Sequence, residues 1–205
     1  EPAFFNRLPE RAWLEQRLAR SLQQADSYEE ILGRCRIFGQ EQQFLIGVRV
    51  LAGTVGPRQA GRAFAALAEV ISAALLAASR REFEAAHGRM RRGRVALIAM
   101  GKLGSREMSP ASDLDLILIY DAPPASETSD GPRPLPISTY YARLSHRLIG
   151  AITAPPGRRR CIPSLRPSVL TRARYGGFTR SADQCDRCRH PAWRFLRRGD
   201  GRDHD

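Results

Sequence analysis

Two aspartates stand on alternate positions at the start of a short apolar run, and they are the strongest candidates for chemistry in this chain. Asp113 and Asp115 interleave with leucines that begin at Leu114. In a β-strand, residues i and i+2 point to the same face, so both carboxylates are expected on one side of a strand. Such a pair suits Mg²⁺, which binds through one or two carboxylates and completes its shell with water and substrate phosphates. The pattern predicts phosphate chemistry on a nucleotide.

The stretch Met-Gly-Lys-Leu-Gly-Ser precedes the aspartates and is a candidate phosphate cradle. Gly101 and Gly104 allow backbone N–H groups to approach a phosphate closely. Lys102 can contact a phosphate, and Ser105 and Ser112 can add hydroxyl donors. The ordinary alternatives are two turn-forming glycines, a solvated lysine and a strand that starts with two solvated acids.

Short buried strands must position these residues, and the sequence predicts two. The apolar run 95–100 is bounded by glycines, and residues 114–120 repeat that signature. Residues 123–136 have the composition of a loop, and apolar residues at helical spacing predict a helix over 137–152. Helices packed on a small mixed sheet give an α+β fold with a helical region before it.

Residues 1–90 are predicted to form that helical lead-in region, because their apolar residues recur at helical spacing. Ser27 and Glu30 match a capping box at the start of one helix, and Gly88 is the expected terminator of another. The apolar stretch 44–51 fits a buried helix or a strand. A helix is favoured because it continues the preceding pattern.

The formal charge of +12 belongs mainly to the end of the chain. The excess of basic residues is 2 in residues 1–90, 2 in 91–154 and 8 in 155–205. The last segment follows neither a helical nor a strand period, so it is expected to be disordered. No aromatic residues interleave with the arginine runs 158–160 and 197–198, so no specific nucleic-acid partner is expected. Without a signal-peptide pattern, a disulfide framework or an apolar run near 18 residues, the chain is expected in the cytoplasm and away from membranes.

Residues 99–121 read Ala-Met-Gly-Lys-Leu-Gly-Ser-Arg-Glu-Met-Ser-Pro-Ala-Ser-Asp-Leu-Asp-Leu-Ile-Leu-Ile-Tyr-Asp. This sequence resembles that of the glutamine synthetase adenylyltransferases. These bacterial enzymes belong to the polymerase-β-like nucleotidyltransferase superfamily. Residues 36–49, 129–134 and 140–144 also look like that family, so the resemblance covers roughly residues 1–154. The motif wording is more similar to the C-terminal, AMP-adding domain than to the adenylyl-removing one.

The resemblance implies a nucleotidyltransferase that uses Mg²⁺ and ATP to place AMP on a tyrosine of glutamine synthetase, with a PII-type signalling protein as a possible further partner. It makes Asp113 and Asp115 the catalytic metal ligands. It assigns nucleotide binding to Gly101, Lys102, Gly104, Ser105 and Ser112. Residues 91–154 would then be an incomplete nucleotidyltransferase core.

The family carries a third carboxylate on a later strand, and this chain lacks it. The position that would carry the aspartate is Ile162, although Leu-Arg-Pro at 165–167 echoes the end of that family segment. We hypothesise that residues from about 156 onward are read out of frame, which sequencing of the coding DNA would test. Weak or absent turnover is expected. The alternatives are a nucleotide-binding fragment, the adenylyl-removing domain, or a small-molecule nucleotidyltransferase of the antibiotic-modifying kind.

Overall fold

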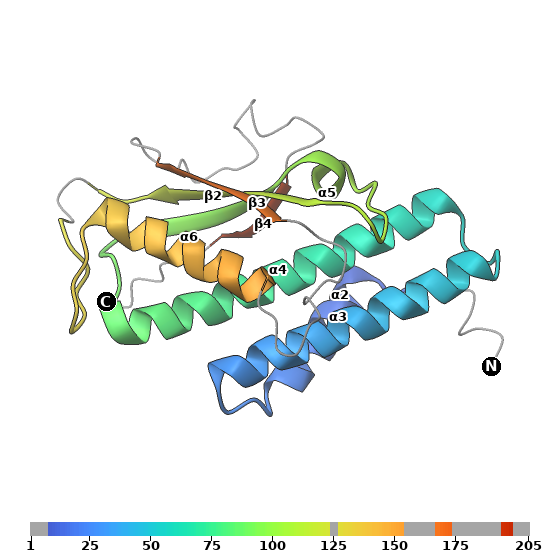
Figure 1. The fold of residues 1–205 in the computed structure, drawn as a ribbon, viewed down its shortest axis with the longest axis horizontal. Helices are drawn as coiled ribbons and strands as arrows, with labels where there is room; N and C mark the ends of the chain where they lie inside the picture. Colours follow the sequence, from blue (N-terminus) through green and yellow to red (C-terminus); the bar gives the residue numbers. More distant parts are fainter. Residues whose placement is uncertain (1–7, 124–126, 154–166, 174–193, 199–205) are drawn as a thin grey trace.

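The computed structural model describes residues 8–123, 127–153, 167–173 and 194–198, the last two ranges as backbone only. Three helices form the lead-in region: α2 (Arg11–Leu22), α3 (Tyr28–Leu51) and α4 (Pro57–His87). Figure 1 shows α4 between the sheet on one side and α2 and α3 on the other. The helical prediction for residues 44–51 is confirmed, since they lie inside α3.

The start of α3 is built as its sequence predicts, with one difference. The Ser27 hydroxyl accepts a hydrogen bond from the Glu30 backbone N–H at 3.1 Å, which caps the helix. The Glu30 carboxylate accepts from the N–H of Asp26 at 3.0 Å, one residue earlier than in a capping box. That hydrogen bond, followed by the contact with Arg34, lowers the pKa of Glu30.

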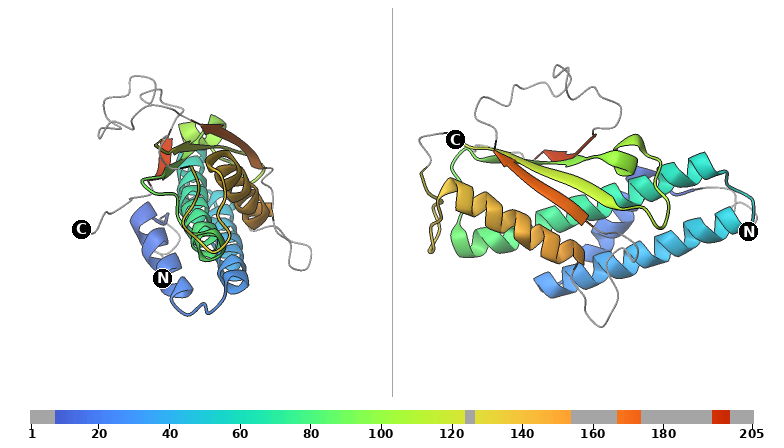
Figure 2. Two further views of the ribbon diagram at one scale, coloured as in Figure 1. Left: turned by 90° about the vertical axis from the view of Figure 1, so that its left-hand side faces the viewer. Right: turned by 45° about the horizontal axis from the view of Figure 1, so that its top comes forward.

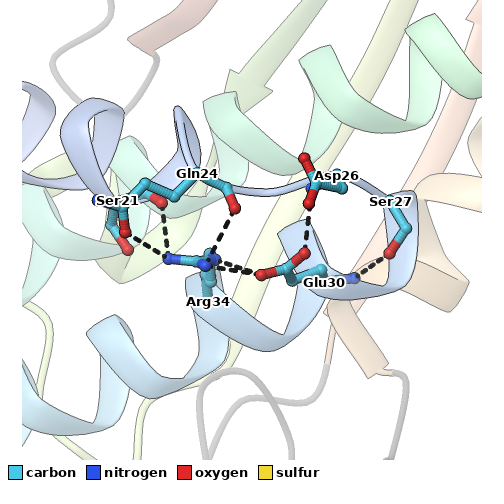
Figure 3. Close-up of polar contacts among 6 residues, drawn as sticks. All are labelled: Ser21, Gln24, Asp26, Ser27, Glu30 and Arg34. Carbon is cyan, nitrogen blue, oxygen red and sulfur yellow. Dashed lines mark hydrogen bonds and ion pairs between the residues drawn. The ribbon is translucent and has the colours of Figure 1, made fainter.

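Arg34 fastens the turn between α2 and α3 (Figure 3). Its guanidinium donates to the Ser21 carbonyl at 3.0 Å and to the Gln24 carbonyl at 3.1 Å. It also binds Glu30, four residues earlier on α3, at 2.6 Å. One side chain of α3 thus satisfies carbonyls at the end of α2, where intrahelical donors run out.

The sheet has the strand order β3-β2-β1-β4. Strand β1 (Arg94–Ala99) pairs antiparallel with β2 (Leu114–Asp121), and the short helix α5 (Gly101–Ser105) lies in their connection. Helix α6 (Ile137–Thr153) packs beside α4 under the sheet (Figure 2). Both predicted strands and the predicted helix over 137–152 are confirmed, and the fold is α+β.

Two segments of the region expected to be disordered are strands. Strand β3 (Pro167–Ala173) runs parallel to β2, and β4 (Arg194–Arg198) runs antiparallel to β1. The expectation of disorder rested on side-chain periodicity, whereas strand addition to an open sheet edge is driven by backbone hydrogen bonds. The rest of residues 155–205 lies outside the described residues.

Helix α4 lies at the centre of the core. Its apolar stripe packs against α2, α3 and α6, and its end at Gly88 has a φ of 73°, as expected of a glycine terminator.

The prediction that no apolar run approaches 18 residues was wrong: α4 has the length and composition to cross a membrane, with a mean hydropathy of 1.6 over its best window. Within the protein, 72% of that window is buried, as in a core helix.

The segment 129–134 is tied to the end of α4. The Arg89 N–H donates to Asp130 Oδ1 at 2.6 Å, and the Asp130 N–H donates to the Arg89 carbonyl at 3.1 Å. Gly131 lies against Gly88 so closely that neither has room for a β-carbon. The contacts fix this loop where β1 begins and β2 ends, at the opposite end of the sheet from the candidate aspartates.

Candidate functional site

Asp115 meets the glycine turn at the point where β1 ends. The Met100 N–H donates to the Asp115 carbonyl at 2.9 Å, which continues the ladder past Ala99. Gly101 then turns the chain with a φ of 52°, a conformation that favours glycine. A β-carbon at Gly101 would stand 2.6 Å from Asp115 Oδ2. The backbone therefore favours glycine at 101, and a β-carbon there would displace the Asp115 carboxylate.

Burial along β2 alternates as predicted. Leu114, Leu116 and Leu118 are buried in the main core, whereas Asp115 is half-buried on the other face. Asp113 lies immediately before the strand and is exposed. Carboxylate oxygens are ligands that Mg²⁺ prefers, so both side chains are of the chemical type that binds this cation.

A third acidic ligand does not occur near this pair in the part of the chain that the structure describes. No group of three or more His, Cys, Asp or Glu residues suited to a metal ion is present there. Strand β3 lies directly beside β2 and contains no acidic residue, and Ser168 stands in register with Asp115. The site offers two carboxylates.

The other predicted nucleotide-binding residues divide into two kinds. Lys102 and Ser105 are exposed on α5, and the Ser105 hydroxyl makes only long contacts, 3.4 Å to the Lys102 carbonyl and 3.3 Å to Glu107 Oε2. Gly104 is buried, and its N–H donates to the Met100 carbonyl at 3.0 Å. The Gly104 N–H is thus engaged within α5.

Ser112 is also engaged internally. Its side chain is buried, and its hydroxyl oxygen accepts from the Ser109 N–H at 2.9 Å and lies 2.9 Å from the Ser109 hydroxyl. The Ser112 N–H donates back to the Ser109 carbonyl at 3.1 Å. Ser112 therefore shapes the turn that delivers Asp113 to the sheet.

Sequence reasoning missed a buried ion-pair cluster behind the glycine turn. Glu69 of α4 is fully buried and contacts two guanidinium groups, Arg11 at 2.9 Å and Arg106 at 3.6 Å. A signal was present, because Glu69 is the sole acid between Pro57 and Arg81 and interrupts an otherwise apolar stretch. An acid inside such a stretch requires a partner from elsewhere in the chain.

Two cavities lie away from the aspartates and the glycine turn. One of about 630 Å³ lies between α2 and α3 and is lined by Arg17, Arg20 and Arg34 among others. Another of about 790 Å³ runs along α2 and α4 past Leu18 and Ala74. Neither is lined by the aspartates or the glycine turn, so the candidate site is located by its carboxylates and the turn beside them.

Known proteins match most of this chain. A family model described as glutamate-ammonia ligase adenylyltransferase matches residues 1–166, somewhat further than the 1–154 expected. A bifunctional glutamine synthetase adenylyltransferase/adenylyl-removing enzyme of Mesorhizobium japonicum is 51% identical over 155 residues, and its counterpart in Brucella suis is 49% identical over 155 residues. Each match covers 76% of this chain and 16% of the relative, so the chain spans a small part of their length.

Proposed function

Because this chain belongs to the glutamate–ammonia ligase adenylyltransferase family, we propose that it carries the Mg²⁺ and ATP site of an enzyme that transfers AMP to a tyrosine of glutamine synthetase. The observation that carries the proposal is the contact of the Asp115 carboxylate with Gly101, which joins the metal-binding acid to the glycine turn. The sequence of residues 99–121 is more similar to the AMP-adding domain of the family, which supports AMP transfer over AMP removal.

Each residue has a chemical task in this proposal. Asp113 and Asp115 would hold Mg²⁺, which would neutralise charge on the phosphates. The turn at Gly101 brings backbone close to the triphosphate, and the exposed amine of Lys102 adds positive charge. Gly104 and Ser112 contribute by holding the shape of the turn, and Ser105 offers an exposed hydroxyl.

The reaction is an in-line displacement. The tyrosine oxygen bonds to the α-phosphorus, the bond from that phosphorus to the bridging oxygen breaks, pyrophosphate leaves with the bonding electrons, and the phenolic proton passes to water. Positioning and charge neutralisation lower the barrier. The family's third carboxylate has no counterpart among the residues that the structure describes, so we expect turnover by this chain to be far below that of a site with three carboxylates.

The proposal places the protein in the cytoplasm, with glutamine synthetase as its substrate and a PII-type protein as a further partner. It includes no membrane and no specific nucleic acid. We also propose that residues from about 156 onward are read out of frame: a reading-frame shift near codon 156 of the coding DNA should restore a segment like Val-Asp-Met-Arg, in which the family carries its third carboxylate. If no shift of one or two nucleotides does so, the hypothesis is wrong.

A labelling assay tests the function. The chain is incubated with glutamine synthetase, Mg²⁺ and ATP labelled in the α-phosphate, and incorporation of label into the synthetase is measured against an Asp115→Asn variant. Slow incorporation that the variant lacks supports transfer. Phosphate-dependent release of ADP from previously adenylylated synthetase would instead assign the adenylyl-removing direction.

The second candidate function is nucleotide binding without turnover, and the lack of an acidic residue on β3, the described strand beside Asp115, favours it. It predicts Mg²⁺-dependent ATP binding with no label on glutamine synthetase. A chain that neither binds ATP nor transfers AMP contradicts both candidates. Label on a small-molecule acceptor in place of the synthetase would point to the antibiotic-modifying class.

A further inference from the structure

The buried carboxylate of Glu69, on α4, faces the turn that follows α5. Glu69 Oε2 accepts from Arg11 Nη1 at 2.9 Å, and Glu69 Oε1 lies 3.6 Å from Arg106 Nε. Among the described residues, neither Oε1 nor that Nε has a hydrogen-bond partner. Removing an ion from water is unfavourable, so an acid at this depth depends on its two guanidinium neighbours. The pair with Arg106 joins α4 to the site.

Arg106 occupies a backbone position that glycine would adopt more easily. Its φ is 61°, and its N–H donates to the Leu103 carbonyl at 3.2 Å, which ends α5. The left-handed conformation carries an energetic cost for a residue with a β-carbon. A residue held there despite this cost implies that its side chain has a use, and the guanidinium of Arg106 is directed at Glu69.

Helix α4 touches the same turn at a second point, two helical turns before Glu69. A β-carbon at Gly61 would stand 3.3 Å from the Met108 carbonyl oxygen and 3.4 Å from that of Arg106. The backbone of residues 106–108 therefore rests on α4. A continuous series of contacts leads from Glu69 through Arg106 and α5 to Gly101 and the Asp115 carboxylate.

We propose that Glu69 is a positioning residue of the nucleotide site: through Arg106 it fixes the end of α5 and so sets Gly101 against Asp115. The inference rests on the proposed function for its effect on nucleotide binding. The structural part of the inference concerns only how well ordered residues 101–107 are, which does not depend on nucleotide. Arg11 provides the matched control, because it binds the other oxygen of Glu69 and belongs to α2, away from the turn.

The test compares Glu69→Gln, Arg106→Gly and Arg11→Gln in the full chain by titration with Mg²⁺ and ATP, at a temperature where circular dichroism shows each variant folded. Glu69→Gln and Arg106→Gly should each weaken binding about tenfold, or about 1.4 kcal/mol, and the double variant should be no weaker than either. Arg106→Gly is informative because it relieves the backbone while removing the guanidinium. Arg11→Gln should lower the melting temperature and leave affinity within twofold.

Amide hydrogen exchange gives a readout that needs no nucleotide. Glu69→Gln and Arg106→Gly should speed exchange in residues 101–107, whereas Arg11→Gln should speed it in α2 alone. If the wild-type chain fails to bind ATP but the exchange pattern holds, the proposed function fails and the positioning role stands. Unchanged exchange in residues 101–107, or an Arg11→Gln variant that matches Glu69→Gln in both readouts, overturns the inference.

Discussion

The Asp115 carboxylate lies directly against Gly101, with Oδ2 only 2.6 Å from the place where a β-carbon of residue 101 would stand. Strand pairing produces this contact, since the Met100 N–H donates to the Asp115 carbonyl and brings the end of β1 beside the start of β2. The glycine turn and the acid therefore form one unit, and a change in either displaces the other.

Gly101→Ala tests that unit. The added methyl group collides with the carboxylate, and the φ of 52° becomes strained, so we expect Mg²⁺-dependent ATP binding to fall at least tenfold together with a loss of roughly 1–2 kcal/mol in the free energy of unfolding. Titration calorimetry and urea unfolding measure the two effects.

Gly150→Ala is the matched control for that substitution. Gly150 is an exposed residue of α6 with no atom within 4 Å of an added β-carbon, so this change should raise stability by about 0.5–1 kcal/mol and leave binding unaltered. A Gly101→Ala variant that binds as well as Gly150→Ala would show that the close approach has no role in the site.

Ser112 and Ser105 should differ in what they contribute to stability. Ser112→Ala removes a part-buried hydrogen bond from the Ser109 N–H and a second one with the Ser109 hydroxyl, and should cost about 1–1.5 kcal/mol in the free energy of unfolding. Ser105→Ala removes only long, exposed contacts and should change it by less than about 0.5 kcal/mol. Denaturant titration of both variants decides the matter, and an equal or reversed order would contradict the placement of Ser112 inside the loop.

Tyr140 should make stability depend on alkaline pH. Burial raises its pKa from 10 to about 12, and its hydroxyl donates to the Gly88 carbonyl at 3.1 Å. Between pH 10 and about 12 the unfolded chain loses the phenolic proton while the folded protein retains it, so stability is full below pH 10 and falls as pH rises.

Tyr140→Phe isolates that contribution. It should lower the free energy of unfolding by about 1 kcal/mol near pH 7 through the lost hydrogen bond and flatten the decline above pH 10. Tyr141 also has a raised pKa through burial, so part of the slope should remain. A profile identical to that of the wild type would show that Tyr140 does not titrate as described.

Local patterns in the sequence were enough to predict the parts of the fold that local physics controls. The Ser27 cap, the terminator Gly88 and the alternation of Asp115 with its leucine neighbours all follow from spacing within a few residues. The pair of Glu69 and Arg106 joins residues far apart in the chain, so no period reveals it. The engaged donors of Gly104 and Ser112 depend on the turn geometry, which residue type alone leaves open.

The strands β3 and β4 also could not be predicted from local patterns in the sequence. Their residues carry no clear alternation, and their place at the two edges of the sheet depends on the backbone groups that β1 and β2 leave open. Composition predicts burial, whereas edge pairing is decided by hydrogen bonds that every residue type except proline can make.

The most direct measurement is ATP binding with and without Mg²⁺ in the wild-type chain and in the Asp113→Asn, Asp115→Asn and Asp121→Asn variants. Asp121 ends the same strand at its other end and serves as the charge control. We predict that the wild type and Asp121→Asn bind at least tenfold more tightly with Mg²⁺ than in excess chelator, and that both other variants lose this difference. Equal affinity with and without Mg²⁺ in the wild type, or a Mg²⁺ effect that survives in Asp115→Asn, would contradict the assignment of this site.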